Sequence, residues 1–240
     1  MALVLVPSEH ILPFALPCLA CISPRVEAVS YIITGLVAYL LGSIPTGYLV
    51  ARAKGVDIRT VGSGNIGATN VFRFLGKPAG IFVLLADALK GWVAVRVVAV
   101  WLAENLLPPD SLGGSVEIAT TLAGISAVLG HNYTCWLRFK GGKGIATSAG
   151  VLTALVPWAL LIILGVWIVL FVLTRYVSLG SIAAAAVLPF ATWFTEQSIW
   201  LTVVTSAMSA IAIYKHKGNI QRLLAGTESR INFRKEKTAS

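Results

Sequence analysis

Charged residues are scarce in this sequence. Only 12% of its 240 residues are Asp, Glu, Lys or Arg, whereas 57% are hydrophobic and the mean hydropathy is +0.82. Soluble globular domains contain about 25% charged residues. The composition therefore excludes an ordinary soluble domain and predicts an integral membrane protein.

Cysteine and histidine are also few. Three cysteines make no even-numbered disulfide framework and are too few for a structural zinc site. Few acidic residues lie near the three histidines in the sequence, so the pattern indicates no Ser-His-Asp triad and no metal cluster. These residues are Cys18, Cys21, Cys135, His10, His131 and His216. We expect the protein to use neither a metal nor a cofactor.

The net charge of +9 comes from basic residues in short segments between apolar runs. They lack the interleaved aromatic residues of a nucleic-acid surface, so we expect no nucleic-acid partner and interpret them as topology signals. Residues 52–77 contain five basic residues and one acid, which predicts a cytoplasmic loop. Residues 104–117 contain three acids and no Lys or Arg, which predicts an external loop.

Apolar runs predict seven membrane-spanning helices. The 29 residues from 145 to 173 carry no charge, and one straight helix of that length would measure about 43 Å. Either one long tilted helix or a break at Pro157 fits, and we prefer the break because it returns Arg175 and the basic C-terminal tail to the cytoplasm. The fold class is then all-α, with the N-terminus outside and the C-terminus cytoplasmic. The predicted spans are 31–50, 78–103, 118–137, 145–156, 157–173, 177–195 and 198–214.

The ends of the chain differ from its centre. Residues 1–29 contain four prolines and no basic residue before Arg25, which predicts a loose or interfacial extension without the basic start of a signal peptide. We expect residues 30–230 to form one membrane domain and residues 231–240 to form a basic tail. Within the first span, the stretch 42–47 contains Pro45 and predicts a kink.

The stretch 62–70 is the densest cluster of small polar residues, and Arg73 follows it. Glycines permit close backbone approach, so successive N–H groups can face one anion, and the small side chains add donors. A flexible surface turn is the alternative. We favour anion binding because the stretch lies on the predicted cytoplasmic face. The candidate phosphate-binding residues here are Gly62, Ser63, Gly64, Asn65, Gly67, Thr69 and Asn70.

Three further polar clusters fall on the same face. Gly142 and Lys143 let an ammonium group approach a phosphate, but the full spacing of a nucleotide-binding P-loop is absent. Ser178 and Ser181 are three residues apart, so both can face one site, or one can cap a helix, which we favour. His216 and Asn219 share one face of a short amphipathic helix within 216–228.

Asp87 and Lys90 lie three residues apart within the second predicted span. Ionisable residues inside a membrane are candidates for function, but this spacing also suits a structural ion pair. We interpret them as a structural pair, because each satisfies the other.

Five motifs together resemble one family, the bacterial acyl-phosphate:glycerol-3-phosphate acyltransferases, or PlsY family. The resemblance covers about residues 30–230. The motifs are GSIPTG at 42–47, GSGNIGATNVFR at 62–73, Gly130-His131 with FKGGKGIAT at 139–147, TRYVSLGS at 174–181, and HKGNIQRLLAGTE at 216–228.

The resemblance implies acyl transfer from acyl phosphate to the 1-hydroxyl of glycerol 3-phosphate, giving lysophosphatidic acid and inorganic phosphate. It implies seven helices in the bacterial cytoplasmic (inner) membrane, in contact with membrane lipid, and a cytoplasmic active site. We expect substrate-assisted catalysis without a protein general base. The sequence does not indicate an oligomeric state. The positions that match the family's important polar residues are Ser63, Arg73, Lys143, Ser181, His216 and Asn219.

A transporter or flippase for a phosphorylated solute is the alternative function. It would use the same loops and a helix broken at Pro157 near an anion site. Against it, the polar clusters gather at one membrane face, and the sequence has no inverted repeat.

Overall fold

The computed structural model describes residues 24–107 and 112–231, and every regular element in these ranges is helical. The all-α prediction is confirmed for this part of the chain. Residues 1–23, Asp110 and the tail residues 232–240 lie outside the described ranges. The helices are α1 (Pro24–Ser43), α2 (Thr46–Ala53), α3 (Ala68–Leu75), α4 (Lys77–Val93), η2 (Ala94–Ala99, π-helical), α5 (Val100–Leu106), α6 (Leu112–Asn132), η4 (Cys135–Leu137, 3-10), α7 (Ile145–Leu155), α8 (Pro157–Thr174), α9 (Val177–Glu196), α10 (Ile199–Lys215) and α11 (Lys217–Leu224).

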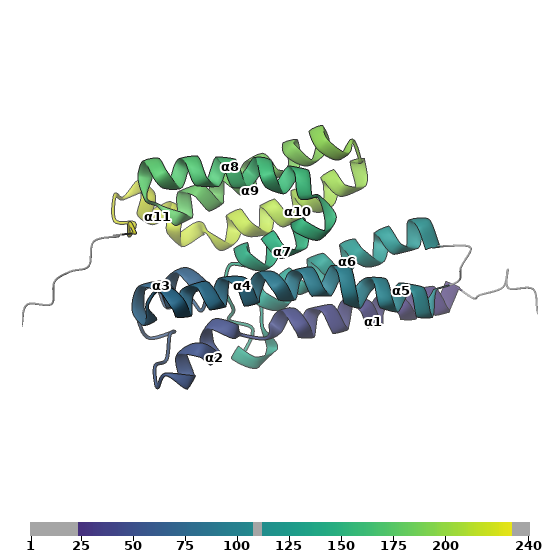
Figure 1. The fold of residues 1–240 in the computed structure, drawn as a ribbon, viewed down its shortest axis with the longest axis horizontal. Coiled ribbons are helices and arrows are strands. Elements are labelled where there is room, and N and C mark those ends of the chain that lie inside the picture. The colour runs from purple at the N-terminus through teal and green to yellow at the C-terminus, as the bar shows by residue number, and fades with distance from the viewer. Residues whose placement is uncertain (1–23, 108–111, 232–240) are drawn as a thin grey trace, which may run out of the picture.

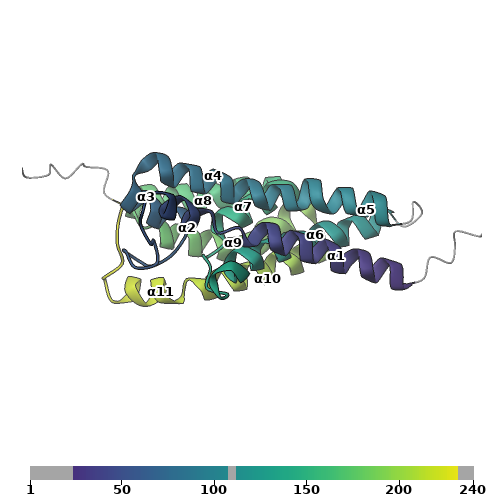
Figure 2. The ribbon, with the colours of Figure 1, turned by 90° about the horizontal axis from the view of Figure 1, so that it is seen from below.

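The helices form two layers, as Figure 1 shows. One layer holds α8, α9 and α10, and the other holds α1 to α6, with α7 between them. The main packing partners are α1 with α6, α4 with α7, α8 with α9, and α9 with α10. The elements α4, η2 and α5 follow one another without a gap and form a single long rod, which Figure 2 shows from a second side.

Glycines bring two helix pairs into close contact. A Cβ atom on Gly42 of α1 would overlap the backbone of Ala127, and one on Gly130 of α6 would overlap the carbonyl oxygen of Tyr39. In α4 and α7, Gly91 and Gly150 meet the opposite backbone in the same way. Small residues at such crossings let helix backbones approach closely inside a membrane, where packing rather than hydrophobic burial drives helix association.

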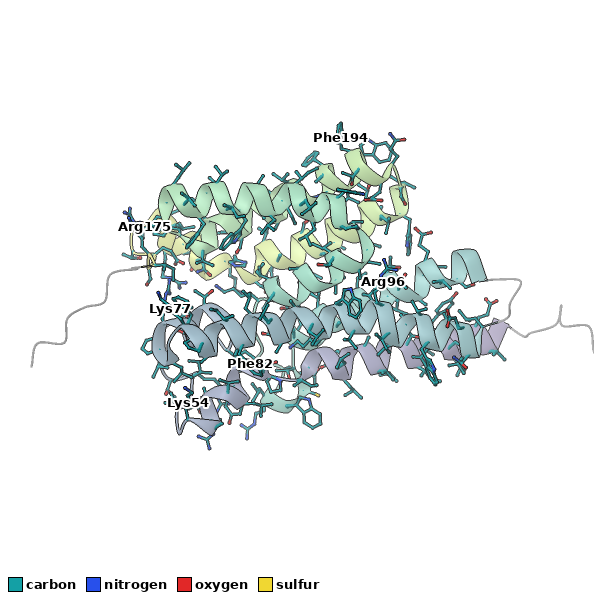
Figure 3. All side chains as sticks on the ribbon, viewed as in Figure 1. Lys54, Lys77, Phe82, Arg96, Arg175 and Phe194 are labelled. Carbon is teal, nitrogen blue, oxygen red and sulfur yellow. The ribbon has the colours of Figure 1, made fainter. Side chains whose placement is uncertain are left out.

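The outer surface of the bundle is apolar. Leu173 of α8 is 75% exposed and Phe194 of α9 is 80% exposed, and Figure 3 shows Phe194 pointing away from the helices. Within the described residues, three helical stretches are long and apolar enough to cross a membrane: Val26–Ala53, which runs from α1 through the break into α2, Pro157–Thr174 and Val177–Glu196. The lipid tails of a bilayer would cover this surface.

The predicted break at Pro157 is confirmed, and the predicted kink within 42–47 is a full break between two helices. The first helix stops at Ser43 and α2 begins after Pro45, while α7 ends at Leu155 and α8 begins at Pro157. Proline lacks the N–H group that would continue the helix and restricts the residue before it. Other limits differ from the prediction: α1 begins at Pro24 and α6 at Leu112, several residues before the apolar runs. Hydropathy marks the apolar part of a helix, whereas backbone hydrogen bonds extend into its polar ends.

Candidate active site

The predicted polar clusters lie at one end of the bundle. Helices α2, α3 and α11 are at the same end in both views (Figures 1 and 2). Figure 3 places Lys54, Lys77 and Arg175 at this end and Arg96 away from it. The loops that precede α3, α7 and α9 are therefore candidates for a single site.

Asn70 organises the glycine-rich loop 62–70 from within. Its side chain is buried, and its Nδ2 atom lies 3.2, 3.1 and 3.0 Å from the carbonyl oxygens of Ile58, Val61 and Asn65. Its Oδ1 atom accepts a hydrogen bond from the backbone N–H of Ser63 at 3.2 Å. The side chain of Asn70 thus shapes the loop, and its polar atoms are engaged there.

The loop then leads directly into α3. Gly62 and Gly64 have φ values of 58° and 66°, which glycine adopts without strain. The Oδ1 atom of Asn65 accepts from the Gly67 N–H at 2.8 Å and fixes the turn before Ala68, the first residue of α3. The first N–H groups of a helix have no intrahelical acceptor and attract anions. Ser63 is exposed at the start of this turn.

A second polar centre forms around Glu228. Its Oε1 atom accepts hydrogen bonds from Ser178 Oγ and Asn219 Nδ2, both at 2.7 Å, and its Oε2 atom accepts from Arg222 Nε at 2.7 Å. Lys143 Nζ donates to Asn219 Oδ1. The Glu228 side chain is 6% exposed. This centre joins the loop before α7, the start of α9, and α11.

The segment that carries Glu228 also contacts α3. Arg73 Nη2 donates to the carbonyl oxygen of Ser229 at 2.9 Å, and the N–H of Ile231 donates to the carbonyl oxygen of Arg175 at 3.0 Å. Arg73 is therefore held beside the Glu228 centre by the chain that follows α11.

The ammonium group of Lys143 loses its proton more readily here than that of an exposed lysine. Burial lowers the pKa of its ammonium group from 10.5 to about 8; the Glu228 carboxylate opposes this, while the charges of Arg222 and Arg73 add to it. Burial also lowers the pKa of Arg73. The pKa of the Glu228 carboxyl group is also lowered. Burial alone would raise this pKa, but the hydrogen bonds that the carboxylate accepts outweigh burial. The centre is a set of cations with one internal carboxylate.

His216 is neutral at pH 7. Burial, followed by the charge of Lys143, lowers its pKa to about 4, against opposing contributions from Ala212 and Glu228. Its Nδ1 atom lies 2.8 Å from the carbonyl oxygen of Ala212, so Nδ1 carries the proton and Nε2 is left as a hydrogen-bond acceptor. An acceptor of this kind suits a hydroxyl group.

Neither serine of α9 caps the helix, so the predicted cap is wrong. The residue before α9 is Tyr176, which makes no side-chain cap. Ser178 binds Glu228 instead, and Ser181 donates to the carbonyl oxygen of Val177 at 2.9 Å and accepts from Trp167 Nε1 at 3.2 Å. Because α9 begins at Val177, both serines lie inside the helix and neither occupies its N-cap position.

The structure brings some of the sequence-predicted residues together and leaves others apart. Lys143 contacts Asn219 directly, while His216 and Arg73 adjoin the same centre. The contacts of Ser63 stay within the glycine-rich loop. Ser181 bonds to Val177 and Trp167.

Sequence reasoning missed Glu228 and Arg222 as site residues. A signal existed, because Glu228 is the only acid among the basic residues 215–230. Within residues 24–107 and 112–231, no group of three His, Cys, Asp or Glu residues is arranged to hold a metal ion.

The helical fold and this site define a class: a multi-pass membrane protein with a cluster of cationic and polar side chains at one end of its bundle. The model of the family "Glycerol-3-phosphate acyltransferase" matches residues 32–226. The glycerol-3-phosphate acyltransferase of Geotalea daltonii is 47% identical over 192 residues, which is 80% of this chain and 93% of the relative.

Two crystal structures of PlsY, an integral membrane glycerol 3-phosphate acyltransferase, resemble this chain. The glycerol 3-phosphate form has a TM-score of 0.74 at 40% identity, and the lysophosphatidic acid form has 0.72 at 39%. Each match covers 85% of this chain and 96% of the PlsY chain. The chain belongs to the glycerol-3-phosphate acyltransferase family and is an acyltransferase. Nothing in these matches supports the transporter alternative.

Proposed function

We propose that this enzyme transfers a fatty acyl group from acyl phosphate to the 1-hydroxyl of glycerol 3-phosphate, giving lysophosphatidic acid and inorganic phosphate. The observation that carries the proposal is the cationic centre of Lys143 and Arg73 beside the neutral His216. The crystal structures of PlsY in glycerol 3-phosphate and lysophosphatidic acid forms add support.

Two anion-holding elements suit two phosphorylated substrates. The loop 62–70, with Ser63 and the first amides of α3, would hold the phosphate of the acyl donor. Arg73 and Lys143 would neutralise and place glycerol 3-phosphate, the guanidinium group by a bidentate contact. In the reaction, the hydroxyl oxygen bonds to the acyl carbon and the bond from that carbon to the phosphate oxygen breaks.

The departing phosphate accepts the hydroxyl proton. A phosphate group has a second pKa near 6, whereas the pKa of His216 is lowered to about 4. The phosphate is therefore the stronger base by about two pKa units. His216 and Asn219 would orient the hydroxyl, and positioning with electrostatic stabilisation would supply most of the rate.

We further propose seven spans in a bacterial inner membrane, with the N-terminus outside and the active site cytoplasmic. The candidate spans are α1, the α4–η2–α5 rod, α6, α7, α8, α9 and α10. The concentration of Lys54, Lys77 and Arg175 at the site's end supports the orientation, since cytoplasmic loops are rich in basic residues. Residues 30–230 would form one catalytic domain, close to the 32–226 matched by the family model.

The experiment is acyl transfer to radiolabelled glycerol 3-phosphate by the purified protein in detergent, with palmitoyl phosphate or palmitoyl-CoA in separate reactions. We expect lysophosphatidic acid only from palmitoyl phosphate. Lys143→Ala should abolish the product, whereas Lys54→Ala, which removes an exposed lysine at the end of α2, should not. Product from palmitoyl-CoA alone would refute the proposed donor, and full activity of Lys143→Ala would refute the proposed site.

A further inference from the structure

Asp87, Lys90 and His131 form a buried charged cluster near the proposed site. Their exposed fractions are 1%, 6% and 5%. Lys90 Nζ lies 2.7 Å from Asp87 Oδ1 and 3.1 Å from His131 Nδ1. The predicted Asp87–Lys90 pair is present, but a histidine from α6 joins it. Because Lys90 donates to Nδ1, the proton of the neutral imidazole lies on Nε2.

One side of the cluster holds the break between α1 and α2. Lys90 Nζ donates to the carbonyl oxygen of Ile44 at 2.8 Å, and Thr46 Oγ1 donates to Asp87 Oδ1 at 3.0 Å. The next residue, Gly47, lies so close to the carbonyl oxygen of Ile66 that a Cβ atom would overlap it. The cluster thus fixes the start of α2, which contacts the glycine-rich loop 62–70.

The other side of the cluster holds the Lys143 loop, residues 138–144 between η4 and α7. The carbonyl oxygen of His131 accepts from the Gly142 N–H at 3.0 Å. The His131 ring lies against Gly142 itself, where a Cβ atom would overlap Nε2. The imidazole held by Lys90 is therefore the surface against which the residue before Lys143 packs.

Stability alone is a weak explanation for this cluster. Burying an ion pair costs desolvation free energy, and apolar residues of similar volume are often as stabilising or more so. The geometry points to another role. We propose that Asp87, Lys90 and His131 are positioning residues that set the distance between the glycine-rich loop and the Lys143 loop. This inference rests on the proposed assignment of the two loops to the two substrate phosphates.

The first test replaces the ion pair by apolar residues of similar size, Asp87→Leu with Lys90→Met. For the folded variant we expect kcat/KM for glycerol 3-phosphate to fall about 10- to 100-fold, because a displacement near 1 Å at a reacting centre has effects of this size. Active-site titration separates this fall in kcat/KM per active site from a merely structural effect. In a merely structural effect, fewer molecules are active and each active molecule keeps the wild-type kcat and KM. That structural outcome, or unchanged kinetics, would overturn the proposal.

Two single substitutions, one a test and one a control, provide the same comparison if the double variant does not fold. Thr46→Val removes one hydrogen bond to the cluster, and Thr121→Val removes the acceptor of Trp200 Nε1 in another part of α6. We expect a loss of about 3-fold or more in kcat/KM for Thr46→Val and none for Thr121→Val. Equal kinetics of the two variants would contradict the inference.

The distance itself can be measured by electron–electron double resonance. Spin labels at the exposed residues Thr60 and Lys140 would report the separation of the two loops, after the three native cysteines are replaced by serine. We expect the distance distribution to shift or broaden in the double variant or in Thr46→Val but not in Thr121→Val. An unchanged distribution would overturn the positioning role even if activity fell. This readout needs no substrate, so it stands apart from a failure of the proposed acyl donor.

Discussion

Raising the pH through 8 removes the charge of Lys143 in the free enzyme, and we expect capture of glycerol 3-phosphate to weaken with it. Burial, with further lowering by Arg222 and Arg73, brings the pKa of Lys143 to about 8 although Glu228 opposes it. About nine-tenths of the molecules then carry the charge at pH 7 and about one-tenth at pH 9. The value of kcat/KM should therefore fall about tenfold between pH 7 and pH 9.

The assay is phosphate release from acyl phosphate at varied glycerol 3-phosphate between pH 6.5 and 10, with Lys143→Ala as the blank for spontaneous hydrolysis. The substrate phosphate, with a second pKa near 6, is already a dianion over most of this range. A bound dianion raises the pKa of the ammonium group, so the decline in kcat should occur at higher pH than that in kcat/KM. Lys143→Arg should lose the decline, since guanidinium stays charged. A flat wild-type profile to pH 9.5, or the same decline in Lys143→Arg, would refute this reasoning.

Three further predictions concern the same centre. Because the pKa of His216 is about 4, the pH profiles of kcat/KM for wild type and His216→Gln should have the same shape between pH 5.5 and 7. A step near pH 6.5 that occurs only in wild type would contradict this prediction. Gly142→Ala should lower kcat/KM about 10- to 100-fold, because the new Cβ atom would displace the loop from His131. Gly165→Ala is the control, since a Cβ atom there meets no other atom within 4 Å, and it should leave kcat/KM unchanged. Equal kinetics of the two variants would exclude the steric argument. Lys143→Met should raise the thermal midpoint in detergent at pH 7, where most molecules carry the buried charge. The gain should disappear between pH 8 and 10.5, as the charge is lost first in the folded and then in the unfolded state. A lower midpoint at pH 7 would disprove this prediction.

The helices and their breaks could be predicted because their signals are local. Pro45 and Pro157 mark the two breaks that the structure contains, and charge-free runs mark the apolar helices. The glycine-rich loop and Lys143 could be singled out as candidates for an anion site, because small residues and basic residues together favour such a site.

The missed features depend on contacts between distant residues. His131 joins Lys90 across 41 positions, which no pattern of spacing along one helix reveals. Glu228 belongs to the centre because the chain after α11 folds back, so that Glu228 meets Asn219 of α11 and Ser178 of α9. A lone acid in a basic segment is usually a solvated counter-charge, and only tertiary packing shows that this one is 6% exposed.

Binding of the phosphate of glycerol 3-phosphate by Lys143 is central to the proposed function. Isothermal titration of glycerol 3-phosphate into the purified protein at pH 7 tests it without the acyl donor. We predict that Lys143→Met abolishes measurable binding and that Lys54→Met, which removes an exposed lysine, leaves the affinity unchanged. Wild-type affinity in a folded Lys143→Met variant would contradict the account.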